Sequence, residues 1–186
     1  FGAGPLMFPP LLVICLDEVL HASEFVQVAI TAALPIIVMP AVLQGWAAFL
    51  DRHHIVVFRA AHAWIAVAGS LLLAAAVLAE VPWLLWPGAL LMGISLAAGS
   101  LGWSLGHNDF APRGEETRYM ALHVTLTGLR GLLAPPVAIL AYYGLRRLSP
   151  GIETWSMSLP VGLIVSGAWQ FTAMCRDHGA VGPART

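Results

Sequence analysis

Lysine is absent from this chain of 186 residues, and charged residues of every kind make up only 10% of it. Soluble domains carry about 25% charged residues. With 59% hydrophobic residues and a mean hydropathy of +0.80, the chain has more apolar surface than a soluble protein of this size can bury. The nine basic residues, all arginine, form no basic stripe along which nucleic-acid phosphates would bind. The composition therefore excludes an ordinary soluble domain, and we expect no nucleic-acid partner.

Cysteine is also scarce, and no signal peptide is evident. Cys15 and Cys175 fall near opposite membrane faces in the topology below, so we expect no disulfide between them. The chain starts at Phe1 inside an apolar segment that lacks the charged n-region of a signal peptide. We therefore expect a piece of a longer protein.

Charged residues are missing from several stretches that are each about as long as the roughly 20 residues needed to cross a bilayer core. These stretches lie between Glu24 and Asp51, Arg59 and Glu80, Glu80 and Asp109, and Glu153 and Arg176. The sequence therefore predicts an all-α, polytopic membrane protein whose partner is the lipid bilayer. Six transmembrane helices are expected over residues 1–16, 25–50, 57–79, 83–105, 118–143 and 155–175, followed by a tail over 177–186.

The arginines predict the orientation of these helices. Short connections make neighbouring helices antiparallel, which leaves only Arg146 and Arg147 on one side of the membrane. The other side collects Arg52, Arg59, Arg113, Arg118, Arg176 and Arg185. The positive-inside rule then places both termini in the cytoplasm of a multi-pass protein of the cell (inner) membrane.

Arg130 is the one charge deep within a predicted span. A charge there costs a few kcal/mol or more and usually faces a cavity or a partner. Arg130 lies about 12 residues from Arg118, or roughly 18 Å along a helix, which is mid-membrane. No acidic residue lies deep in any predicted span. Its counter-charge is therefore expected on an anionic solute or on a part of the protein outside this chain.

Helical spacing places other polar residues beside Arg130. Thr127 and His123 precede it by three and seven residues and share its face. Folding the spans 83–105 and 118–143 together about residue 112 brings His123 near Trp103 and puts Arg130 opposite residues 94–98. The resulting polar seam, expected to line a cavity, consists of Trp103, His107, His123, Thr127 and Arg130.

Two segments resemble the major facilitator superfamily of transporters. The loop after the second predicted span contains Gly45 and then Leu50-Asp51-Arg52, similar to the loop signature that follows the second helix of each six-helix half, without its later Gly-Arg-Arg portion. Gly131-Leu-Leu-Ala134-Pro135 is similar to the glycine-proline hinge of the fifth helix. The whole stretch 101–135 looks like the tenth and eleventh helices of these transporters.

The resemblance implies a C-terminal half built from two three-helix repeats of inverted topology, with an N-terminal six-helix half as partner. It implies transport of a small solute by alternating access, with no catalytic residue, cofactor or metal. Asp51, Arg52 and Asp109 would form the cytoplasmic gate. An acid at a helix C-terminus is unfavourable for the helix dipole, so Asp51 needs a partner, either Arg52 or a group on another helix.

In a transporter, His107 and His123 can titrate near physiological pH and carry a transport-coupled proton. Two alternatives to a transporter stay open. In the first, His107 and His123 hold haem or a metal in a membrane-integral redox protein. The second is a non-transporting membrane scaffold or sensor. The substrate, the coupling ion and the direction of transport do not follow from the residues.

Overall fold

The computed structural model describes residues 2–106, 110–112 and 114–177, which form a bundle of long helices with no strand among them. In chain order the elements are α1 (Ala3–Glu18), α2 (Glu24–Val28), the π-helical turn η1 (Ala29–Ala33), α3 (Leu34–Arg52), α4 (Ile55–Leu78), the 3-10 turn η2 (Pro82–Leu84), α5 (Leu85–Leu105), α6 (Glu116–Leu148), the 3-10 turn η3 (Glu153–Met157) and α7 (Ser158–Asp177). Because α2, η1 and α3 run on without a break, they form one span, called here the 24–52 span. The predicted all-α class is confirmed.

Among the described residues, five of the helical segments are long and apolar enough to cross a membrane, so five of the six predicted spans have a counterpart of this kind. The five are Glu24–Arg52, Ile55–Leu78, Pro82–Leu105, Glu116–Leu148 and Glu153–Arg176. The first predicted span corresponds to α1, which has 16 residues. At 1.5 Å per residue it is about 24 Å long, short of the roughly 30 Å bilayer core. The arrangement is that of a multi-pass membrane protein.

Local sequence explains where the helices end. His53 has an extended backbone after α3, and the Nδ1 atom of His54 accepts a hydrogen bond from the backbone N–H of Val56 at the start of α4 (3.3 Å). After α4 the chain reverses at Glu80 (φ 52°), and after α6 it reverses at Gly151 (φ 97°). A left-handed conformation of this kind suits glycine in particular. These short reversals make consecutive helices antiparallel.

The packing of the helices follows a regular pattern. We group them into a first triple (α1, the 24–52 span and α4) and a second triple (α5, α6 and α7). α1 packs against α6 and α7 of the second triple, while α5 packs against α3 and α4 of the first. The third helices, α4 and α7, pack against each other. The first helix of each triple therefore contacts the second and third helices of the other.

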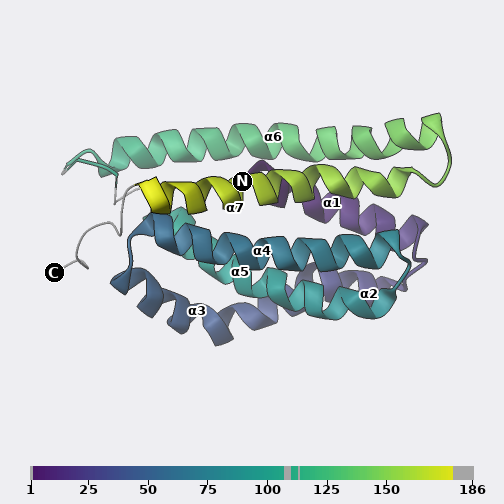
Figure 1. The fold of residues 1–186 in the computed structure, drawn as a ribbon, viewed down its shortest axis with the longest axis horizontal. Helices are drawn as coiled ribbons and strands as arrows, with labels where there is room; N and C mark the ends of the chain where they lie inside the picture. Colours follow the sequence, from purple (N-terminus) through teal and green to yellow (C-terminus); the bar gives the residue numbers. More distant parts are fainter. Residues whose placement is uncertain (1, 107–109, 113, 178–186) are drawn as a thin grey trace.

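Burial differs sharply between the helices of one triple. In α4, 56% of the residues in the apolar stretch are buried, whereas the value is 11% in both the 24–52 span and α6. Figure 1 shows α6 and α3 on opposite sides of the bundle, with α4, α5 and α7 between them. The second helix of each triple is thus the one that presents most of its surface to the outside.

Candidate functional site

Three residues of the polar seam lie on the less exposed face of α6. His123, Thr127 and Arg130 are partly buried, and the same stripe continues to the buried Ala134. The leucines between them point outward, with Leu129 about half exposed (52%). Helical periodicity therefore placed three members of the polar seam correctly on one face of this helix.

Arg130 lies near the middle of α6 and makes hydrogen bonds to neutral groups. Its Nε atom donates to the carbonyl oxygen of Leu126 (3.1 Å) and its Nη2 atom donates to the Thr127 hydroxyl (2.8 Å). Its Nη1 atom lies against the backbone of Gly2, where a side chain would collide with it. Among the described residues the ion pairs join Arg118 to Glu115 and Arg146 to Glu18. Within that part of the chain, Arg130 has no carboxylate partner.

A second arginine, missed in the sequence analysis, lies near Arg130. Arg59 served in the sequence analysis only to set the orientation of the helices, and in the structure it lies in the second turn of α4 (Ile55–Leu78). Its Nη2 atom donates to the carbonyl oxygen of Gly102 (2.8 Å), and its guanidinium lies 6.0 Å from the ring centre of Phe171. The charges of Arg59 and Arg130 repel each other. Two cations therefore share this region of the bundle with neutral hydrogen-bond acceptors.

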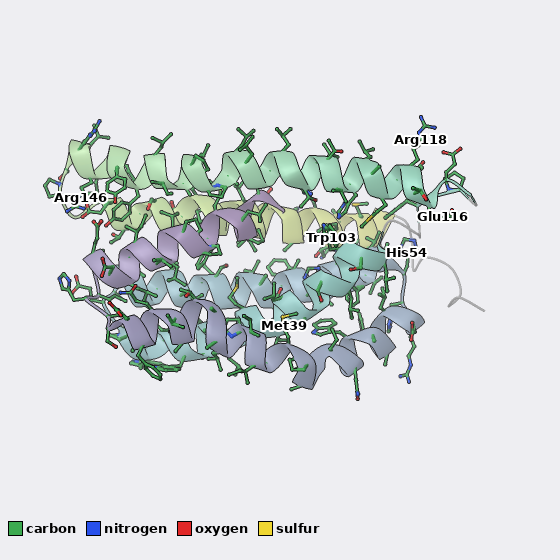
Figure 2. The ribbon with its side chains drawn as sticks, turned by 180° about the vertical axis from the view of Figure 1, so that it is seen from behind. Met39, His54, Trp103, Glu116, Arg118 and Arg146 are labelled. Atoms are coloured by element: carbon green, nitrogen blue, oxygen red, sulfur yellow. The ribbon has the colours of Figure 1, made fainter. Side chains whose placement is uncertain are left out.

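The expected contact between Trp103 and His123 is present, with ring centres 5.9 Å apart and planes inclined by 53°. Figure 2 shows Trp103 in the half of the molecule that also holds His54 and Arg118. His107, the remaining member of the polar seam, lies outside the described residues. Four of the five seam residues are therefore placed, on α5 and α6.

The expected position of Arg130 opposite residues 94–98 is wrong. α6 packs along α1 rather than along α5, and residues of α1 face Ser95 and Gly99 of α5 across a cavity. α1 therefore lies where the sequence predicts a direct contact between α5 and α6. The sequence contained no signal for this, because both helices adjoin the same loop and were expected to fold onto each other.

The gate residues are described only in part. Asp51 and Arg52 end α3 and are exposed, and within the described residues neither forms an ion pair. Asp109 lies outside those residues. Nearby, the rings of His54 and Phe110 approach edge to face, with centres 5.9 Å apart. The gate role of these residues stays a prediction.

A polar cluster at the opposite end of the bundle was also missed. The Glu18 carboxylate at the end of α1 accepts hydrogen bonds from the hydroxyls of Tyr142 (3.3 Å) and Tyr143 (3.2 Å) and forms an ion pair with Arg146. Figure 2 shows Arg146 at the end of the bundle away from Arg118. The signal was available: Arg146 is predicted on the side with few arginines, and Glu18 directly follows the predicted span 1–16, which ends on that side.

An apolar cavity of about 200 Å³ lies between α1, the 24–52 span, α4 and α5. Its wall includes the buried side chains of Phe8, Leu12 and Ile30. The expected seam residues do not line it. Sequence reasoning could not have found this cavity, because it depends on how the shapes of four consecutive helical segments fit together.

Within the described residues, no group of three or more His, Cys, Asp or Glu side chains is arranged to hold a metal ion. No protein-family model, curated protein or solved structure gives a significant match to the chain.

Proposed function

We propose that this chain is one six-helix half of a secondary transporter similar to the major facilitator superfamily, which moves a small solute by alternating access and catalyses no chemical reaction. The observation that carries the proposal is the packing pattern of the two triples. When the two triples are exchanged, α1 takes the position of α5. The contacts of α1 with α6 and α7 then correspond to the contacts of α5 with α3 and α4. Consecutive helices alternate in direction, so α1 and α5 are antiparallel, as in an inverted repeat.

The burial of the helices supports a second half. The 24–52 span and α6 occupy equivalent places in the two triples, and only 11% of the apolar stretch is buried in each. Both leave a large surface free on opposite sides of the bundle (Figure 1). A partner half that lies across one face of the bundle would contact both of these helices along one flank and cover part of each surface, and lipid would cover the rest.

Arg130 is the residue we assign to the solute pathway, together with Thr127, His123 and Trp103. A guanidinium at mid-membrane depth with only neutral acceptors beside it needs an anion. In the assembled transporter that anion is either the solute or a carboxylate of the other half. Either arrangement makes transport depend on the charge of Arg130. Proton coupling through His123 or His107 stays open.

Transport by the full-length protein in proteoliposomes tests this function. Uptake would be measured for a labelled organic acid, an amino acid, a sugar and phosphate, in the wild type and in Arg130→Ala. We expect at least one solute to accumulate and Arg130→Ala to lower that flux about tenfold or more, because a charged hydrogen bond contributes about 1.5–3 kcal/mol. Arg118→Ala is the matched control, since Arg118 is on the same helix with 83% of its side chain exposed.

The outcomes separate the alternatives. Unchanged flux in a well-assembled Arg130→Ala protein would remove Arg130 from the pathway. No flux of any solute by an intact wild type would favour the scaffold or sensor alternative. Absorbance in the haem region, or bound metal in the purified protein, would favour the redox alternative. Six further spans in the sequence that precedes Phe1 are expected, and their absence would contradict the two-half architecture.

A further inference from the structure

The apolar cavity has the features of a ligand site in its own right. Its walls are formed by α1, the 24–52 span, α4 and α5, and one side is open to the outside of the bundle. The deep wall is formed by buried residues such as Phe8, Ile30 and Leu73. Pro9 and Leu96 are the exposed members of the lining, so the mouth lies beside them. No charged residue lines it.

One wall of the cavity contains an irregular backbone. Ile30 and Thr31 belong to the π-helical turn η1, and π-helical turns within α-helices are frequently found at functional sites. Pro35 follows within one turn and also lines the cavity. It is held in place by α5, because a side chain at Gly93 would come within 2.8 Å of the Cα atom of Pro35. The shape of this wall is therefore fixed by close packing of α3 on α5.

The polar atoms in the lining limit what the cavity can hold. The hydroxyl of Thr31 already donates to the carbonyl oxygen of Gln27 (2.7 Å). The hydroxyl of Ser95 donates to the backbone carbonyl oxygen of His62 (3.1 Å). Both hydroxyl oxygens can therefore only accept a further hydrogen bond. A buried water needs two to four polar partners, and an anion needs donors. Neither fits these walls as well as an apolar group does.

The volume limits the size of the occupant. A cavity of about 150 Å³ lined by Leu, Ile and Phe binds benzene in another protein, and the cavity here has about 200 Å³. We propose that this cavity binds a small uncharged aromatic ring, either purely apolar or with one hydroxyl that donates to Thr31 or Ser95. Binding of such a ring is independent of the proposed transport function, because it is measured at equilibrium and needs no flux.

Fluorine NMR on the full-length protein in nanodiscs tests the proposal, with 4-fluorotoluene as the probe and 4-fluorobenzoate as its charged counterpart. We expect 4-fluorotoluene to show saturable binding above its linear partitioning into lipid, and 4-fluorobenzoate to show none. Linear partitioning of 4-fluorotoluene alone would overturn the proposal. Tighter binding of 4-fluorobenzoate would also overturn it, in favour of an anion.

Two variants locate the binding. Gly99 lines the cavity and has no atom within 4 Å of an added Cβ, so Gly99→Leu fills the cavity without a backbone collision. We expect it to weaken 4-fluorotoluene binding at least about tenfold, which is about 1.4 kcal/mol. Gly144→Leu is the matched control, because Gly144 in α6 is equally open and far from the cavity.

Should Gly99→Leu fail to fold, Leu96→Trp serves the same purpose. Leu96 is 49% exposed at the mouth, so a larger side chain there narrows the entrance with little strain in the core. We expect the same loss of binding as in Gly99→Leu. Unchanged saturable binding in a folded Gly99→Leu or Leu96→Trp protein would place the ring elsewhere and overturn the assignment.

Discussion

α4 and α6 are both long enough and apolar enough to cross a membrane, but they are held in the bundle in different ways. Their apolar stretches have mean hydropathies of 2.0 and 1.5, whereas the buried fractions are 56% and 11%. Gly69 of α4 has no room for a side chain, since an added Cβ would lie 3.1 Å from backbone atoms of α5. Gly144 of α6 has open space around it. Hydropathy therefore indicates membrane insertion and leaves helix packing undetermined.

α6 is held by a narrow strip of small residues and by polar contacts. Ala134 and Ala138 are buried on the face that packs against α1, and the Glu18 cluster ties the end of α6 to the end of α1. Within lipid, helices gain little from apolar contact as such, so they associate through close backbone packing and polar contacts. α4 combines close packing with hydrogen bonds to α5 and α7, whereas α6 has less buried surface and depends to a larger extent on polar contacts.

The largest effect on stability is expected where close packing is greatest. Gly69→Val should lower the free energy of unfolding by about 1–3 kcal/mol, because the added methyl groups meet the backbone of α5 at Gly88 and Met92. Gly144→Val in α6 should change it by less than about 0.5 kcal/mol, as a substitution into open space. Unfolding in detergent, followed by circular dichroism, measures both. Equal losses would remove the distinction between α4 and α6.

The positions of most helices could be predicted from the sequence, because charges mark the ends of apolar stretches. The predicted 57–79 and 83–105 spans agree with α4 and with η2 and α5 to within about two residues. Helical periodicity and an antiparallel fold also brought Trp103 to His123 correctly. These results depend on information that is local in the sequence, namely charge, spacing and loop length.

The neighbours of each helix could not be predicted in the same way. α6 lies against α1, which is distant in the sequence, and this choice depends on how small side chains fit together across the interface. Arg59 was missed because, near the start of the predicted 57–79 span, it was counted only as a charge that sets the orientation, and its hydrogen bond to Gly102 of α5 depends on how the helices pack. The cavity depends on the shapes of several segments at once, including a π-helical turn that no residue pattern announced.

A smaller effect is expected from the polar tie between α1 and α6. Glu18 and Arg146 form an ion pair whose side chains are 29% and 49% exposed, so solvent screening limits its strength. A double-mutant cycle with Glu18→Gln and Arg146→Gln should give a coupling free energy of about 1 kcal/mol or less at low salt, and less at high salt. Unfolding at two salt concentrations measures it. A coupling of zero at low salt would show that apolar packing alone holds α6 on α1.

The smallest effect on stability is expected within the polar seam itself, at the hydroxyl that accepts a hydrogen bond from Arg130. Thr127→Val keeps the shape of the side chain but removes the acceptor of the 2.8 Å hydrogen bond. A lost hydrogen bond to a charged group is worth about 1.5–3 kcal/mol, so uptake of the transported solute should fall about tenfold or more. Thr127→Ser, which retains the hydroxyl, should restore most of the flux. Because Thr127 is only partly buried, the unfolding free energy should change little in either variant. A loss of stability without a loss of flux would assign Thr127 to the packing of α6, and the polar seam would then act through Arg130 without this neighbour.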